Sequence, residues 1–279
     1  MNGASHGTHT LRATRAVGRT FDTDSRLAKD PELRVYVSDL ARPYGLAPRE
    51  DLLDSGAGHT YGEMAEQLIG ATVGPHEPVD VLVLALAMPD ARPGRTIAPY
   101  LSDLCPGRPA TFGLCEQGTA APFTAMRIID AYRPSYSDSY RALLIVAEQN
   151  ALHHEPATRP APVPARHTAV AVLFEPSAGG SGEIRQFTDV APDAAASLLD
   201  KQLATLRTPP SHIPLLLGPG ISALYDPAGT GAAADQPYTG LWTQLADLTA
   251  REPSAGRTIL ADYDPVLGYL SLCTLEYEP

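Results

Sequence analysis

The sequence has few cysteines, no long apolar run and no basic cluster, and each absence argues against a class of protein. Its 3 cysteines form no C-x-x-C pair and no disulfide framework, which favours a reducing compartment such as the cytoplasm. No apolar stretch approaches the roughly 18 residues of a membrane span, and no hydrophobic signal segment is visible at the N-terminus. The formal net charge of -11, without a Lys/Arg cluster, argues against non-specific nucleic-acid binding. We therefore expect a cytoplasmic protein that binds neither membranes nor nucleic acid.

The composition is that of a globular protein, with 44% hydrophobic and 19% charged residues. The first part of the chain differs from the rest. Residues 1–32 are polar, rich in Thr, Ser and Gly, and have no sustained hydrophobic period. This stretch is interpreted as a mobile N-terminal arm.

Beyond residue 32, strand-like and helix-like segments alternate. β-Branched, aromatic or continuously apolar character predicts strands at 34–40, 79–87, 110–114, 141–148 and 167–175. Helical spacing predicts helices at 60–74, 95–104 and 118–132. Thr60 is a candidate N-cap for the first of these helices, and Pro122 lies in the first turn of the last one, where proline is tolerated.

A second, shorter run of elements repeats this order with parts missing. It has predicted strands at 182–190, 213–218, 256–263 and 268–277, and predicted helices at 192–206 and 240–249. We therefore expect an α/β protein of two related halves, residues 33–176 and 177–279, with parallel-rich sheets covered by helices.

This order of elements resembles the thiolase superfamily, and within it the β-ketoacyl-acyl-carrier-protein synthase III branch. The stretches that carry the resemblance are VDVLVLALAMPD (79–90), ATFGLCEQGTAAPFTAMRIIDAY (110–132), ALLIVAEQN (142–150) and TILADYDPVLGYLSLCTLEY (258–277). The resemblance implies a five-layered α-β-α-β-α pseudo-duplication whose second half is shortened. It also implies acyl-transfer chemistry, in which a Cys at a helix N-terminus takes the acyl group and a second-half His and Asn stabilise the thioester enolate.

The family's nucleophile position can be located by counting from either side of the turn after the strand 110–114. Counting forward from this strand places it at Gly118, and counting back from the helix 118–132 places it at Thr119. Neither count reaches Cys115. Glu116 and Gln117 line a pocket mouth in one interpretation and cap the helix in another.

The second half does not carry the family's other catalytic residues at their expected places, and its histidine, His212, lies at the opposite end of the strand 213–218. The only asparagines are Asn2 and Asn150, so the second-half Asn is absent. The family's His would follow the strand 213–218, where this sequence has Gly218, Pro219 and Gly220. The condensing triad is therefore missing by residue type.

Three functional hypotheses follow. The first is a catalytically degenerate subunit that pairs with and shapes a catalytic synthase III-like partner in secondary-metabolite biosynthesis, such as that of polyketides or antibiotics. The small subunit of the heterodimeric quinolone-forming synthase is the comparison. The second is an autonomous acyltransferase or thioesterase that uses Cys115 on acyl-carrier-protein or coenzyme A thioesters, although a buried structural cysteine is the simpler interpretation. The third is a homodimer that binds acyl thioesters without turnover.

The resemblance also bears on assembly and on other candidate residues. It implies a dimer through residues about 109–130 and the neighbourhood of Glu148, because the strand 110–114 would otherwise leave an apolar edge open to water. The partner is a complete synthase III-like subunit or a second copy of this chain. Glu148 is expected to make a structural hydrogen bond, and Trp242 to pack inward. No cofactor and no metal site is expected.

Overall fold

The structure is a computed structural model. It describes residues 4–21, 30–55, 58–86, 88, 90, 96–135, 139–151, 153, 162–177, 182–206, 213–225, 231–232, 234–251 and 255–278. The strands in this part of the chain form one 10-stranded sheet. It divides into two five-stranded regions that meet at a short parallel contact, where Arg12 and Ala13 pair with Glu276 and Tyr277.

The first region contains the strands predicted for the first half and one strand from the N-terminal segment. In spatial order these are β4 (Ala110–Leu114), β3 (Val81–Leu86), β5 (Ala142–Glu148), β6 (Thr168–Pro176) and β2 (Leu11–Thr20). Strand β3 is parallel to β4 and β5, whereas β6 is antiparallel to both β5 and β2. Every residue of β5 is buried, as the sequence predicts for a central strand.

The second region repeats four of these five strands, and β1 takes the fifth place at its edge. Its strands are β8 (Leu215–Leu217), β9 (Gly256–Asp264), β10 (Tyr269–Tyr277), β7 (Gly182–Phe187) and β1 (Ala4–His9). The parallel pair β8–β9 and the antiparallel pairs β9–β10 and β10–β7 reproduce the relations β3–β5, β5–β6 and β6–β2. Within the described residues, β4 has no counterpart beside β8. The shortened second half is thus explained by one missing strand.

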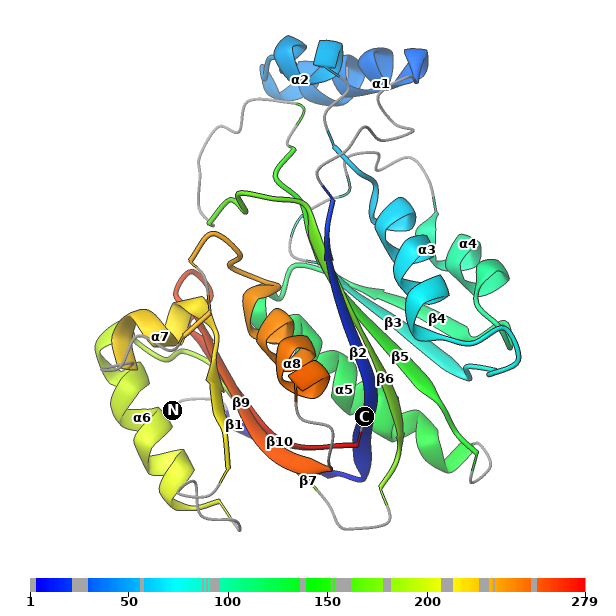
Figure 1. The fold of residues 1–279 in the computed structure, drawn as a ribbon. Helices are drawn as coiled ribbons and strands as arrows, with labels where there is room; N and C mark the ends of the chain where they lie inside the picture. Colours follow the sequence, from blue (N-terminus) through cyan, green and yellow to red (C-terminus); the bar gives the residue numbers. More distant parts are fainter. Residues whose placement is uncertain are drawn as a thin grey trace.

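Helices and sheet regions alternate in five layers (Figure 1). Helices α3 (Tyr61–Thr72) and α4 (Ile97–Leu104) cover the outer face of the first region, and α6 (Pro192–Ala204) and α7 (Pro219–Tyr225) that of the second. Helices α5 (Ala121–Tyr132) and α8 (Gly240–Arg251) lie between the two regions. A short pair, α1 (Pro31–Ala41) and α2 (Glu50–Ser55), lies at one end of the molecule.

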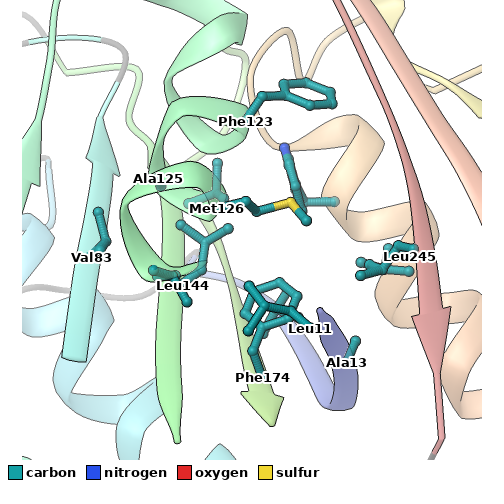
Figure 2. Close-up of a cluster of buried hydrophobic side chains, with 14 of the residues drawn as sticks. Leu11, Ala13, Val83, Phe123, Ala125, Met126, Leu144, Phe174 and Leu245 are labelled. Atoms are coloured by element: carbon teal, nitrogen blue, oxygen red, sulfur yellow. The ribbon is translucent and has the colours of Figure 1, made fainter. Parts of the chain in front are cut away.

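The largest hydrophobic cluster fills the middle layer. In Figure 2, Phe123 and Met126 of α5 lie across from Leu245 of α8, with Leu144 and Phe174 of the first sheet region beneath them. Trp242 is 1% exposed and meets Phe123 edge-on at 5.8 Å between ring centroids, so its predicted inward packing is confirmed. The two halves therefore share one core.

Most predicted elements are present, and their local signals explain why. The α3 helix begins with a capping box, in which Thr60 accepts from the Glu63 backbone N–H and the Glu63 carboxylate accepts from the Thr60 N–H. Pro122 lies in the first turn of α5, as predicted. None of the described helices is long and apolar enough to cross a bilayer.

Two predictions about the N-terminal segment are wrong. Residues 11–20 form β2 rather than part of a mobile arm, because β6 supplies ladder partners along the whole strand and Leu11 and Ala13 are buried. Residues 34–40 are helical rather than a strand. Asp30 caps α1, and Leu33, Val37 and Ala41 recur at helical spacing on its buried face. The division of the chain between residues 176 and 177 stays a prediction.

Candidate functional site

The candidate site lies where β4 ends and α5 begins. Strands β3, β4 and β5 are parallel, so their carboxyl ends reach the same edge of the sheet. Residues 115–117 and a short 3-10 helix, η3 (Gly118–Ala120), connect β4 to α5 at this edge. The turn between β9 and β10 in the second half contacts η3. The two halves of the chain therefore meet at the family's nucleophile position.

The residues of this connection turn the chain sharply from strand to helix. Glu116 and Gly118 both have left-handed backbones, with φ of 62° and 50°. Cys115 is exposed, so the interpretation of a buried structural cysteine is wrong. It follows the last residue of β4, which is an edge strand of the described sheet. Within the described residues, neither η3 nor α5 has a side-chain cap from its own preceding residue, so the capping role considered for Gln117 is not seen.

Gly118 has no room for a side chain. A Cβ at this position would lie 1.7 Å from Oδ2 of Asp264 and 2.8 Å from its Cγ. The same Oδ2 accepts a hydrogen bond from the Thr119 backbone N–H at 3.1 Å. Oδ1 of Asp264 accepts from the N–H groups of Val266 and Leu267 at 3.0 and 2.9 Å, which fixes the β9–β10 turn. The bond from Thr119 to Oδ2 then joins this turn to the connection between β4 and α5, which we call the elbow (residues 115–120). The carboxyl group of Asp264 therefore fills the space into which a nucleophilic side chain at residue 118 would project.

Thr119, the other counted position, also lacks the features of a nucleophile. It is 7% exposed, and its Oγ1 hydrogen-bonds to no other atom in the described part of the chain. A hydroxyl nucleophile needs an adjacent base to take its proton. Thr119 instead contributes its backbone N–H to the contact with Asp264.

The predicted place of the family's His shows the same relationship between a glycine and an aspartate. A Cβ at Gly218 would lie 2.0–2.3 Å from the carboxyl atoms of Asp262, and a Cβ at Gly220 would lie 1.9 Å from the Tyr263 carbonyl oxygen. Pro219 between them begins α7. Asp262 is 2% exposed, and Oδ1 accepts from the Tyr263 N–H at 2.8 Å. Burial raises the pKa of Asp262 to about 8, against the lowering effect of N–H groups from Tyr263, Ile221 and Gly220.

Glu148 makes the structural hydrogen bonds predicted for it. Its Oε2 accepts from the backbone N–H groups of Tyr238 and Thr239 at 2.9 and 3.2 Å, and Oε1 accepts from the Thr239 hydroxyl at 2.5 Å. These residues immediately precede α8, so a carboxyl group at the end of β5 caps a helix of the second half. Burial raises the pKa of Glu148 to about 7, although these hydrogen bonds lower it.

The sequence did not single out Asp262 and Asp264, although a signal was present. The two aspartates alternate along DYD at the end of a strand, so both side chains leave the same face of β9. Each faces a glycine, Gly118 or Gly218, at a position predicted from the sequence to match a catalytic residue of the family. Within the described residues, no group of three or more His, Cys, Asp or Glu is placed to hold a metal ion.

Comparison with known proteins shows similarity in structure only. No protein-family model and no curated protein sequence matches the chain. The tetronic acid condensing enzyme AbyA1 is 17% identical with a TM-score of 0.64, over 95% of this chain and 100% of that one. The acyltransferase ChlB3 is 13% identical with a TM-score of 0.65, over 97% and 98% of the two chains. FabH, the 3-oxoacyl-(acyl carrier protein) synthase III of Pseudomonas aeruginosa PAO1, is 13% identical with a TM-score of 0.66, over 97% and 99%. The chain therefore has the thiolase-superfamily fold of ketosynthase III-like proteins, as its sequence resemblance implies.

Proposed function

We propose that this chain is a catalytically degenerate ketosynthase III-like subunit that pairs with an acyl-condensing partner in secondary-metabolite biosynthesis. The observation that carries the proposal is the Asp264 carboxyl group in the side-chain space of Gly118, 1.7 Å from a Cβ at that position. A thioester-forming cysteine cannot occupy residue 118 while this contact exists.

The hydrogen-bond donors at the elbow support the same conclusion. Condensing chemistry needs N–H groups that are free to stabilise a developing oxyanion. Here the Thr119 N–H donates to Asp264. At the predicted place of the family's His, Gly218 supplies no imidazole, and the space beside it holds the Asp262 carboxyl group. Among the described residues, neither of these two positions therefore presents a group that would stabilise an enolate.

The edge of the first sheet region supports a role in pairing. Strand β4 pairs with β3 on one side, and no described strand pairs with its other side. Phe112 on this strand is half-buried and contacts Tyr132 of α5 at 5.2 Å between ring centroids. Tyr100 and Leu104 of the neighbouring α4 are 41% and 39% exposed. An apolar strand edge flanked by exposed aromatic and aliphatic side chains is typical of a surface covered by a partner.

The similar structures support the class of chemistry. Two of them are named as a condensing enzyme and an acyltransferase. A partner of the same fold that retains a complete catalytic site would supply the activity this chain lacks. The proposed partner is therefore a synthase III-like subunit rather than a second copy. In a dimer of two copies, the Asp264 carboxyl group would fill the nucleophile space of both subunits.

The exposed thiol of Cys115 favours a second candidate, an acyltransferase or thioesterase. It stands at the family's elbow and is accessible to a thioester. Activation would require a base or a cation beside the sulfur. Within the described residues, no hydrogen bond or ion pair involves Cys115, so the first proposal is preferred.

Intact-mass spectrometry separates the two candidates. The chain is purified alone and after co-expression with synthase III-like proteins encoded beside it, and each sample is incubated with acyl-carrier-protein and coenzyme A thioesters. We expect acylation of the partner and none of this chain. An adduct on this chain that disappears in Cys115→Ser would establish the second candidate instead.

A further inference from the structure

A groove lies between the end of β2 and helix α8. Strand β2 is at the edge of the first sheet region opposite to β4 (Figure 1). The volume of the groove is about 400 Å³. The lining comes from the end of β2, the start of β6 and one face of α8, and most of these side chains are small: Ala16, Gly18, Thr20, Thr168, Thr243, Ala246 and Ala250. Arg19 and Asp247 are its charged residues.

The hydrogen-bond pattern of β2 shows which backbone groups face this groove. The Phe21 N–H donates to the His167 carbonyl across the β2–β6 pair. Because backbone groups alternate in direction along an antiparallel strand, residues 15, 17 and 19 also bond towards β6. Ala16, Gly18 and Thr20 then point their N–H and C=O groups away from β6, into the groove.

No described residue satisfies these outward groups. Strand β10 reaches β2 only at Arg12 and Ala13, and the Glu278 N–H donates to the Ala13 carbonyl. The described backbone beyond that contact offers no partner for residues 16–20. On the opposite wall, the buried Oγ1 of Thr243 also has no hydrogen-bond partner in the described part of the chain. Gly18 and Thr20 are exposed, so this part of β2 is an open strand edge that another chain can pair with. On the α8 wall, the Thr243 hydroxyl is a buried polar group whose partner a ligand can supply.

We infer that this groove binds an extended segment of a partner protein, which adds to the first sheet region as a strand beside β2. Residues 16–20 span about 16 Å at roughly 3.3 Å per residue, which matches about five residues of an extended peptide. Such a peptide offers C=O and N–H groups at the spacing of the outward groups of Ala16, Gly18 and Thr20. Strand addition of this kind uses main-chain hydrogen bonds for affinity and alternate side chains for specificity.

The walls define which segment fits. Every second residue of the added strand would face α8, where a Cβ at Gly18 would already lie 3.9 Å from the Ala246 Cβ. Alanine, glycine or serine fits on that face, whereas the other face tolerates β-branched residues. Asp247 is exposed at the groove and pairs with Arg251 of α8 at 3.6 Å, and Arg19 lines the opposite wall, so the selection of a segment rests on the small side chains rather than on charge. The bulge at Thr14, between Ala13 and Arg15, limits pairing to the last part of β2.

Proline substitutions on β2 test the backbone orientation. Gly18→Pro removes an outward N–H and leaves the β6 ladder intact, so we expect its free energy of unfolding to stay within about 1 kcal/mol of wild type. Arg19→Pro removes a ladder hydrogen bond to β6, so we expect its urea midpoint of unfolding to fall clearly below that of Gly18→Pro. If the two costs are reversed, the outward assignment and the inference are overturned.

Peptide binding tests the ligand. The probe is Ac-Lys-Val-Ala-Val-Ala-Val-Lys-NH2, and the control peptide carries tyrosine in place of both alanines. We expect the alanine peptide to slow hydrogen exchange at residues 16–20 at least tenfold, and Gly18→Pro and Thr243→Val to weaken its binding at least tenfold. The tyrosine peptide should give no protection.

Two results would refute the inference: unchanged exchange at millimolar alanine peptide, or binding of this peptide by Gly18→Pro and Thr243→Val as tight as by the wild type. Concentration-dependent self-association that Gly18→Pro abolishes would identify a second copy as the occupant and overturn a partner segment.

Discussion

Gly118 and Asp264, which lie 146 positions apart in the chain, are in direct contact, and the Asp264 carboxyl group occupies the place of a side chain at residue 118. A Cβ at residue 118 would lie 1.7 Å from Oδ2 of Asp264, while that oxygen accepts the backbone N–H of Thr119. The aspartate thus replaces a side chain at the elbow and also binds the first turn that leads into α5. The same carboxyl group therefore fills the side-chain space of residue 118 and joins the β9–β10 turn to the start of α5.

The first prediction is a coupling between these two residues. Gly118→Ala should lower the free energy of unfolding by about 2–4 kcal/mol, because the new methyl group overlaps a buried carboxyl group and the backbone is left-handed. Asp264→Gly should also destabilise, since three N–H groups lose their acceptor. In the double variant the clash is absent, so its loss should be smaller than the sum of the single losses. Urea unfolding of all four proteins measures this coupling, and strict additivity would contradict it.

The family's cysteine can be reintroduced as a control on function. Gly118→Cys combined with Asp264→Gly should form no condensation product, because the second half still lacks the His and Asn of the family. Product formation by this double variant, measured with acyl thioesters, would show that condensation by this chain does not require the family's His and Asn.

The second prediction concerns thiol reactivity. Cys115 is exposed, whereas Cys105 and Cys273 are buried and burial raises the pKa of both, that of Cys105 to about 12. Iodoacetamide at neutral pH should therefore label Cys115 at the rate of a free thiol and leave the other two unlabelled until the protein unfolds. Labelling of Cys115 much faster than a model thiol would indicate an activated nucleophile.

Removal of the same thiol separates structure from catalysis. Cys115→Ala should change the free energy of unfolding by less than about 0.5 kcal/mol, since an exposed side chain is lost. The activity of the assembled complex should stay within a few-fold of wild type. A decrease of about 10³ in kcat would instead place Cys115 in the reaction.

The third prediction is a fall in stability as pH rises. The folded state raises the pKa of Asp262 to about 8 and that of Glu148 to about 7, above the values near 4 of unfolded carboxyl groups. Between these values the folded state binds more protons than the unfolded state, so the free energy of unfolding decreases with increasing pH. Urea unfolding at pH 5 and pH 8 should differ by an amount on the order of 1–3 kcal/mol from these two groups. Asp262→Asn should reduce this difference, whereas Asp103→Asn on the surface should leave it unchanged.

Elements were predicted correctly where the local sequence signal, such as a capping pair or an apolar run, favours the structure that the fold requires. Thr60 and Glu63 cap α3 as their spacing indicates, and β5 is buried throughout as its apolar run indicates. The segment of β2 carried too weak a signal, because it is held by pairing with β6, which lies more than 140 residues further along the chain. The β-branched and aromatic residues Val35, Tyr36 and Val37 suggested a strand in α1, where the caps and the apolar spacing decide for helix.

The candidate site was predicted in part for the same reason. The absence of the family's second-half Asn follows from residue types, whereas the predicted mismatch at the Cys and His positions came from counting along the chain. The presence of Asp262 and Asp264 in the vacated spaces depends on how β9 is placed against η3 and α7. That contact joins residues more than 40 positions apart in one case and more than 140 in the other, so no local pattern reports it.

The last prediction concerns assembly through β4. Phe112 lies on the edge strand, beside Tyr132, and its neighbour Gly113 is exposed with open space around the position of a Cβ. Phe112→Asp places a carboxylate in the middle of the proposed interface, and an unpaired buried charge costs several kcal/mol, so partner binding should weaken at least a hundredfold. Tyr44→Asp, at a position that is 77% exposed next to α1 and far from β4, is the matched control and should bind the partner normally.

Light scattering of the chain alone and co-expressed with a synthase III-like neighbour measures the outcome. We expect a heterodimer that Phe112→Asp converts to separate subunits. A homodimer that Phe112→Asp dissociates would keep β4 as the interface and replace the proposed partner with a second copy. A monodisperse monomer of about 30 kDa that binds none of the co-expressed synthase III-like proteins would contradict pairing through β4, because the apolar edge would then be stable in water without a partner.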